Sequence, residues 1–373
     1  MSIPYQICNR CIMDTTDTEI VFDEKGNCNH CNNYYKLAPL YVHSNDNWLE
    51  NLYKLADEIK KNQKNSEYDC IVGVSGGVDS TYVAYWAKKL ELRVLTVHLD
   101  NGWNSELAVK NIENIVTKLN FDYQTWVIDW EEFKDLQISF LKASVANAEI
   151  PTDHSFLAAI YRLCDKYNIK YILSGSNFVT EGILPKSWGY NAKDLKHLND
   201  IHNKFGEIPF KTYPRLGFLK EFYYTYYRKI KMIRLLNHLP YNKQEAMELI
   251  TKELGWQYYG GKHYESIFTR FFQSYILPKK FNIDKRRAHL STLICSNQTT
   301  RLDALEEIKK PPYPDDLLQS DKEYVIKKLG LSNVGFEEIM NAPIKPYKVY
   351  ANNEDFLNFA YKIYYKIKGI KRD

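Results

Sequence analysis

Four cysteines near the start of the chain have the spacing of a metal site. Cys8 and Cys11 form one Cys-x2-Cys pair, and Cys28 and Cys31 form a second pair after sixteen intervening residues. Each pair places two thiolates on one tight turn, and two such turns supply the four ligands of a tetrahedral zinc ion. Four thiolates leave no open position for a substrate, so we predict a structural zinc site. His30 lies between two of the ligands and is an alternative donor.

The segment Ser75-Gly76-Gly77-Val78-Asp79-Ser80 has the composition of a phosphate-binding loop. Its two glycines lack a Cβ atom and allow the backbone to approach phosphate oxygens. The backbone amides and the first turn of a following helix then face the anion, and the two serines add hydroxyl donors. A carboxylate at Asp79 repels phosphate unless a cation lies between them, which implies Mg²⁺. The chain contains no Walker sequence GxxxxGK[ST], so this is a different type of phosphate loop.

Strands and helices alternate on both sides of this loop. Apolar runs predict strands at residues 69–74, 93–99, 124–128 and 170–174, and amphipathic patterns predict helices at 48–61, 81–90, 131–145 and 154–167 and after an N-cap sequence at 104–106. Strands separated by helices of this length predict a doubly wound parallel α/β sheet. Ligands of such sheets lie beyond the carboxyl ends of the strands.

Two further positions fall at predicted strand ends. Asp100 ends the second strand, and Ser174 and Gly175 end the fourth. Both sequences also make good turns, so turn formation is the alternative explanation. Because they border the same edge of the sheet as the phosphate loop, we predict that all three residues contact the nucleotide.

The chain divides into three predicted parts. Residues 1–45 form a zinc-binding knuckle, residues 46–205 form the phosphate-loop domain, and residues 206–373 form a mainly helical domain without further strands that binds substrate or a partner. Within the last part, the aromatic and basic segment from Phe218 to Leu236 is predicted to be one helix. Helix packing, RNA contact and docking of a partner protein are its three candidate roles.

Composition restricts the classes of partner. The chain has 373 residues, a net charge of +4 and 30 tyrosines. This mild positive charge permits an anionic substrate without requiring nucleic acid, so we expect no nucleic-acid partner. We also expect no membrane span and no signal peptide, and hence a cytoplasmic location. Metal binding, catalysis or burial must then explain the seven cysteines.

The remaining cysteines offer no obvious nucleophile. Cys70 lies in a predicted buried strand, Cys164 on an apolar helix face, and Cys295 after an apolar run, so we expect all three in the core. This weakens a sulfur-transfer function. Position 2 is Ser2 rather than the cysteine of an N-terminal glutaminase, and no cysteine lies on a glycine-flanked elbow. Any ammonia must therefore come from a partner or from free ammonium.

Longer stretches carry a family resemblance. The loop at 75–80 is the SGGxDS signature of the PP-loop ATP pyrophosphatases, which cleave ATP to AMP and pyrophosphate. Residues 8–16, 100–106, 261–270 and 278–291 resemble the N-acetyl sugar amidotransferase family, and the resemblance runs from Cys8 to about Arg301. It implies conversion of an acetamido group on an acidic or nucleotide-activated sugar to an acetamidino group in bacterial surface-glycan synthesis. It also implies ATP as co-substrate and ammonia supplied by glutaminase and cyclase-like subunits.

The implied chemistry requires cations, because negative charge gathers on the transferred phosphate. We assign catalytic roles to Asp79, Lys262, Arg270 and Lys285, and substrate binding to Glu265, Arg286 and Arg287. A solvated basic helix face is the alternative explanation for 285–287. The competing functions are a PP-loop enzyme that modifies tRNA by thiolation or ligation, and a non-catalytic nucleotide-binding subunit.

Overall fold

The centre of the protein is a parallel sheet in a computed structural model that describes residues 4–359. Its five strands are β1 (Cys70–Gly73), β2 (Val94–Asp100), β3 (Asp122–Val127), β4 (Tyr171–Ser174) and β5 (Lys231–Arg234). They are ordered β3-β2-β1-β4-β5, and every neighbouring pair is parallel. The chain therefore moves outward from β1 in both directions, which confirms the predicted doubly wound sheet and places a topological switch between β1 and β4.

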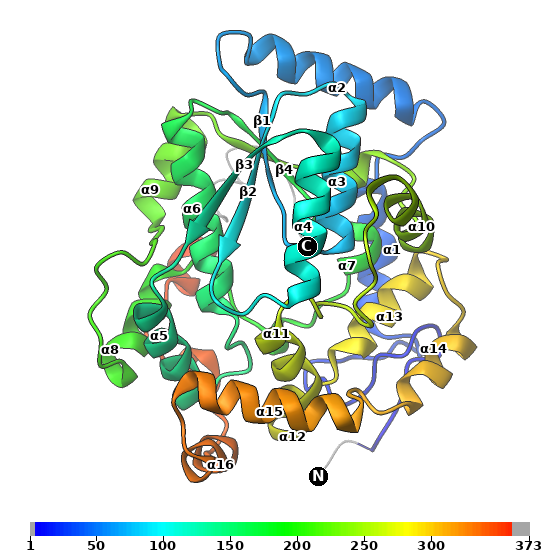
Figure 1. Ribbon diagram of the computed structural model, residues 1–373. Coiled ribbons are helices and arrows are strands. Elements are labelled where there is room, and N and C mark those ends of the chain that lie inside the picture. Colours follow the sequence, from blue (N-terminus) through cyan, green and yellow to red (C-terminus); the bar gives the residue numbers. More distant parts are fainter. Residues whose placement is uncertain (1–3, 360–373) are drawn as a thin grey trace.

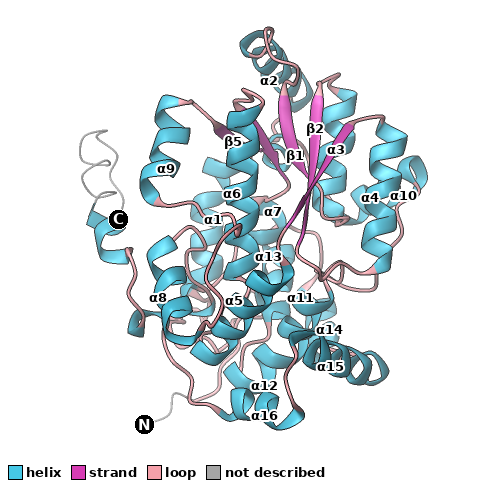
Figure 2. Ribbon diagram, turned by 60° about the vertical axis from the view of Figure 1, so that its left-hand side comes forward, coloured by secondary structure: helices cyan, strands magenta, loops and turns pink. Residues whose placement is uncertain are grey.

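The strands alternate their side chains between two cores. Cys70 and Val72 of β1 pack into one hydrophobic cluster, and Ile71 between them packs into the other. This period of two is the consequence of the strand pleat, and apolar residues on both faces are typical of a sheet covered on both sides. Figure 2 shows the sheet between α6 and α9 on one side and α3, α4 and α10 on the other.

Sixteen α-helices lie within the described residues, and their positions agree with the predicted helices around the sheet. The helices are α1 (Asn29–Tyr41), α2 (Trp48–Asn62), α3 (Val78–Lys89), α4 (Glu106–Leu119), α5 (Trp130–Ala143), α6 (Ile150–Lys166), α7 (Phe178–Glu181), α8 (Leu195–Phe205), α9 (Phe218–Phe222), α10 (Lys243–Leu254), α11 (Ile267–Phe271), α12 (Leu277–Phe281), α13 (Lys285–Cys295), α14 (Arg301–Lys309), α15 (Asp315–Leu329) and α16 (Asn333–Asn341). Ser105 caps α4 by accepting a hydrogen bond from the Ala108 amide at 3.2 Å, as the sequence predicted.

The segment from Phe218 to Leu236 corrects one prediction. It does not form a single helix: α9 and a π turn end at Tyr227, and the chain then enters β5. The expectation of no strands after residue 205 was therefore wrong. β5 lies at the edge of the sheet, and three of its four side chains are exposed. An edge strand requires no apolar alternation, so the sequence of this segment did not reveal the strand.

Helices α11 to α16 and the N-terminal segment form a layer beneath the carboxyl ends of the strands (Figure 1). Their buried residues join α5 and α8 in one large hydrophobic cluster, which also contains the four N-terminal cysteines. None of the helices within residues 4–359 has the length and apolar character needed to cross a bilayer. The layer thus positions residues far apart in sequence at the edge of the sheet where ligands of this fold bind.

Candidate active site

The phosphate loop joins β1 directly to α3. Gly76 has a φ of +79°, and a Cβ atom there would lie 2.7 Å from the carbonyl oxygen of Ala108. Only glycine fits this backbone conformation and this close contact without strain. The Trp256 indole donates a hydrogen bond to the Gly76 carbonyl at 2.8 Å, which fixes the loop from the opposite side.

The two serines of the loop face each other. Their hydroxyl oxygens lie 3.2 Å apart, and the Ser75 hydroxyl accepts from the Gly77 amide at the same distance. The Ser75 side chain is exposed, and α3 begins at Val78 immediately after the glycines. Hydroxyl donors and a helix N-terminus therefore converge at the end of β1, as the predicted phosphate site requires.

Asp79 lies in a charged environment at the first turn of α3. The Tyr241 hydroxyl donates a hydrogen bond to its carboxylate. Burial and repulsion from Glu181 raise the pKa of Asp79, while the charges of Lys262 and Lys243 act in the opposite direction. Two carboxylates are thus held close together beside the phosphate loop, an arrangement that favours an added cation.

Lys262 connects this region to the C-terminal half. Its ammonium group lies 3.3 Å from a Glu181 carboxylate oxygen and 3.4 Å from Nδ1 of His289. Burial and the neighbouring Lys262 and Lys243 charges hold the pKa of His289 well below its usual range, so its ring is neutral at pH 7. Lys262 therefore lies next to the Asp79 region, and its role at phosphate stays a prediction.

Glu265 lies against the glycines of the loop. Its Oε1 atom would be 3.5 Å from a Cβ atom at Gly77 and is 3.4 Å from Nδ1 of His263. Its Oε2 atom is buried and has no hydrogen-bond partner among the described residues. His263 has a φ of +64°, in the left-handed region that few L residues other than Asn, Asp and His adopt. The amides of Ser105 and Ile267 pair with the carbonyls of Glu265 and Trp103, which ties this segment to the end of β2.

Lys285 approaches the same edge of the sheet from α13. It donates a hydrogen bond to Glu149 at 3.1 Å, and Gln273 donates to the same carboxylate oxygen at 2.8 Å. Despite its burial, the pKa of Glu149 is lowered by Lys285 and by the Gln273 hydrogen bond. Asp153, one helical turn further along α6, feels the charges of Glu149 and Lys285. We call the whole group the charged cluster: Asp79, Glu149, Asp153, Glu181, Tyr241, Lys243, Lys262, His263, Glu265, Lys285 and His289.

Three residues predicted for this site are engaged elsewhere. Arg270 forms a two-point ion pair with Asp321, at 2.5 Å and 2.7 Å. Arg286 pairs with Asp284, and Arg287 lies 3.0 Å from an oxygen of Asp14 and donates to a backbone carbonyl of the cysteine knuckle. The structure therefore does not bring these three arginines into the charged cluster.

The predicted nucleotide contacts lie at the ends of their strands. The Asp100 carboxylate accepts hydrogen bonds from the Gly102 amide and the Asn104 side chain, so it shapes the turn after β2. A Cβ atom at Gly175 would meet the backbone of Asp79 and Ser80 at 3.0 Å. The end of β4 thus borders the phosphate loop, whereas the contacts of Asp100 are those of the turn that was the alternative explanation.

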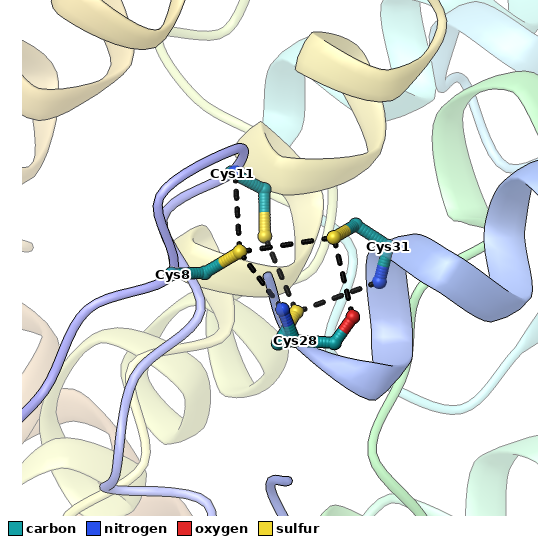
Figure 3. A group of neighbouring side chains, drawn as sticks. All are labelled: Cys8, Cys11, Cys28 and Cys31. Atoms are coloured by element: carbon teal, nitrogen blue, oxygen red, sulfur yellow. Dashed lines mark hydrogen bonds between the residues drawn. The ribbon is translucent and has the colours of Figure 1, made fainter. Parts of the chain in front are cut away.

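The four cysteines converge as Figure 3 shows. Their sulfur atoms all lie within 4.8 Å of one another, with Cys8 and Cys31 at 3.7 Å and Cys11 and Cys28 at 3.5 Å. A zinc tetrahedron with metal–sulfur bonds of about 2.3 Å has edges of about 3.8 Å. The cluster therefore fits zinc. His30 pairs with Asp17 at 2.6 Å instead of facing the sulfurs, so the four thiols form the donor set.

Sequence reasoning missed several members of the charged cluster. Glu181 is the last residue of the short helix α7, which follows β4. Tyr241 and Lys243 flank the N-cap residue of α10, and Asp153 lies near the start of α6. Their proximity to the ends of predicted elements was the available signal. The other three cysteines, Cys70, Cys164 and Cys295, are buried, which agrees with the prediction that they belong to the core.

Comparisons with known proteins divide the chain into two recognisable regions. Residues 51–170 match the NAD synthase family, and residues 265–368 match the family described as LPS biosynthesis protein WbpG-like, C-terminal domain. No curated protein matches the chain. Similar solved structures include an NMN synthetase from Francisella tularensis, with 16% identity, a TM-score of 0.31, and coverage of 57% of this chain and 87% of that chain. An NH3-dependent NAD synthetase from Campylobacter jejuni has 14% identity, a TM-score of 0.31, and coverage of 80% and 98% respectively.

Proposed function

Because the two family matches support its assignment to the WbpG-like amidotransferases of the PP-loop superfamily, we propose that the protein converts an acetamido group of a sugar into an acetamidino group. In this proposal the sugar is acidic or nucleotide-activated, and the reaction consumes ATP and ammonia and releases AMP and pyrophosphate. The product enters the synthesis of a bacterial surface glycan, in agreement with the LPS biosynthesis that the WbpG-like description names.

One observation carries the proposal. The NAD synthase-like region supplies the phosphate loop and Asp79, and the WbpG-like region supplies Glu265, Lys285 and His289 to the same charged cluster. A region with a purely structural role is not expected to direct ionisable side chains toward a phosphate loop. The geometry instead supports a second substrate bound between the loop and the C-terminal helices.

The residues beside the loop fit Mg²⁺. Asp79 and Glu181 repel each other, and the buried Oε2 atom of Glu265 has no partner among the described residues. Carboxylate oxygens are the ligands that Mg²⁺ prefers, and we assign these three side chains to hold it. When bound, the ion neutralises charge on the phosphates of ATP.

The first step activates the acetamido oxygen. This oxygen attacks the α-phosphorus of ATP, and pyrophosphate leaves toward the serine hydroxyls and helix N-terminus of the loop. The acetamido nitrogen releases its proton to water, and a neutral imidoyl adenylate forms. Lys262 and Lys243 lie beside Asp79 and supply positive charge where the phosphate becomes more negative. Lys285, already held by Glu149, is placed to orient the sugar or its attached phosphates.

The second step replaces oxygen by nitrogen. Ammonia attacks the activated carbon, AMP leaves, and the amidine remains. The buried positions of Cys70, Cys164 and Cys295 offer no surface thiol for glutamine cleavage in the described part of the chain. This supports delivery of ammonia from outside, either as free ammonium or from glutaminase and cyclase-like partner subunits.

The test is turnover with a defined set of substrates. Purified, zinc-loaded protein is incubated with ATP, Mg²⁺, ammonium and a panel of nucleotide-linked and free acetamido sugars, and AMP, pyrophosphate and sugar mass are followed. We expect sugar-dependent AMP release and the mass change for exchange of one oxygen for NH. The Asp79→Asn variant should lose this activity. Asp57→Asn, at an exposed position on α2, is the matched control and should retain it.

A tRNA arm separates the main competing function. The exposed side chains of Phe222, Tyr226 and Tyr227 lie next to Arg228 and Lys229, which gives an RNA-modifying enzyme a surface for stacking and phosphate contact. AMP release that requires tRNA and ignores every sugar would replace the amidotransferase proposal. AMP release with sugar in the absence of tRNA would exclude the tRNA-modifying function.

A further inference from the structure

The start of α6 lies across the carboxyl ends of β1 and β2. The Phe156 ring occupies the space that a Cβ atom at Gly73 would need, immediately before the phosphate loop. One turn earlier, the Thr152 hydroxyl accepts a hydrogen bond from the Asn101 side chain at 3.1 Å, just after β2. Asp153 lies three residues before Phe156 and therefore shares its face of the helix. This places the Asp153 carboxylate over the edge of the sheet where ATP is expected.

Asp153 differs from the other carboxylates of the charged cluster. Glu149 is paired with Lys285, Glu181 with Lys262, and Glu265 with His263. For Asp153, an exposed residue, the described part of the structure contains neither an ion pair nor a side-chain hydrogen bond. Its oxygens are thus accessible to a small molecule that enters the site.

The surrounding charges favour a proton on this group near neutral pH. Desolvation of the carboxylate by the surrounding protein and repulsion from Glu149 raise the pKa of Asp153 to about 7, with a smaller contribution from Glu181. Lys285 and His263 oppose this increase. A carboxylate that is half protonated near the working pH is well matched to accept and release a proton during turnover.

We propose that Asp153 is the catalytic base that takes a proton from ammonium and so generates the ammonia that attacks the activated sugar. This assignment rests on the proposed function and adds the group that controls its second step. The open carboxylate receives the proton, while the paired carboxylates Glu149 and Glu181 remain charged beside it and attract the cation.

The step balances in atoms and charge. Ammonium transfers one proton to the Asp153 carboxylate and becomes ammonia. The nitrogen lone pair forms a bond to the imidoyl carbon, the bond from that carbon to the AMP oxygen breaks, and AMP leaves with the electron pair. The product keeps the remaining protons of the nitrogen and is a positively charged amidinium. Asp153 then releases its proton to water.

The experiment compares two nucleophiles and the first half-reaction in Asp153→Asn. With ammonium near pH 7, we expect amidine formation to fall on the order of 100-fold or more, the usual contribution of a positioned base. Hydroxylamine is largely unprotonated at this pH and needs no base, so the variant should use it at the wild-type rate. Sugar-dependent exchange of labelled pyrophosphate into ATP reports only the first step and should persist.

The pH profile supplies an independent readout. In the wild type, the ammonium-dependent rate should rise through about pH 7 with the ionisation of Asp153 and then level off. In Asp153→Asn it should continue to rise, because only free ammonia then reacts. Asp57→Asn should behave as the wild type in every arm.

Each outcome decides the assignment. Equal loss with ammonium and hydroxylamine would show that Asp153 positions the nucleophile or the sugar, and would overturn its role as a base. An unchanged ammonium rate would overturn it as well. Absence of sugar-dependent pyrophosphate exchange in the wild type would refute the proposed function itself and remove the basis of this inference.

Discussion

Arg270 offers a direct test of structure against sequence, because the sequence predicts a catalytic cation and the structure shows a buried ion pair. Its guanidinium meets Asp321 at 2.5 and 2.7 Å, and the side chains are 14% and 7% exposed. Tyr313 donates a further hydrogen bond to the same carboxylate. Replacing Arg270 by alanine leaves a buried carboxylate without its countercharge, which costs about 3–5 kcal/mol.

This cost converts to a measurable melting shift. An unfolding entropy of about 2.1 cal/mol/K per residue gives about 0.8 kcal/mol/K for 373 residues. Arg270→Ala should therefore lower the melting temperature by about 4–6 °C. Combining Arg270→Met with Asp321→Asn removes both charges and should restore part of this loss.

Two assays on the same samples decide the role of Arg270. Melting is followed by calorimetry, and ATP–pyrophosphate exchange is measured well below the melting transition. We expect the double variant, if folded, to retain most of its exchange activity. An unchanged melting temperature in Arg270→Ala together with lost exchange would refute the structural role and return Arg270 to the list of catalytic residues.

Three further outcomes follow from local geometry. Gly76→Ala forces a left-handed backbone on alanine, at a cost of about 1–2 kcal/mol, and drives its Cβ toward the Ala108 carbonyl. Pyrophosphate exchange should fall on the order of tenfold or more, whereas Gly330→Ala, with a φ of +70° and open space around it, should not affect exchange. His197 is fully buried and its pKa is lowered by burial to about 4, below the 6.5 of an unfolded histidine, so the unfolded state binds its proton first as the pH falls. The free energy of unfolding should therefore drop by about 2 kcal/mol between pH 7.5 and pH 5 through this group, and urea titrations of His197→Phe should lack this component. Metal analysis of the purified protein should give one zinc per chain, and Cys31→Ser should lower both zinc content and melting temperature; a metal-free wild type with the same stability would refute the zinc site.

The fold was largely predictable because its signals are local. The alternation of apolar runs and amphipathic segments between residues 69 and 176 gives each strand and helix its own periodicity, and short connections restrict how they assemble. β5 escaped prediction because an edge strand needs little apolar pattern. The residues before β5 form a short helix and a π turn, and the predicted helix was wrongly extended from them into the strand.

The candidate active site was only half predictable for a different reason. The phosphate loop is contiguous in sequence, and its two glycines and two serines are recognisable in one segment. Glu149 and Asp153 lie one turn apart at the start of α6, but they meet Glu181 of α7 and Lys285 of α13 only through tertiary packing. No spacing rule links residues that meet through tertiary structure, and three arginines of the same basic segments took up ion pairs elsewhere.

The cysteine knuckle and the charged cluster are joined through α13. Lys285 and His289, one turn apart, face the charged cluster, and Arg287 and Ser291, also one turn apart, face the knuckle, to whose backbone they bond. Positions offset by two residues lie on opposite sides of a helix, so α13 separates the knuckle from the charged cluster and contacts both. Arg301, at the start of α14, donates hydrogen bonds to the backbone carbonyls of Cys8 and Cys11 and so adds a second contact between the C-terminal helices and the knuckle. A structural metal in the knuckle would therefore act on catalysis without touching substrate, by fixing the helix that carries Lys285 and His289 to the phosphate loop.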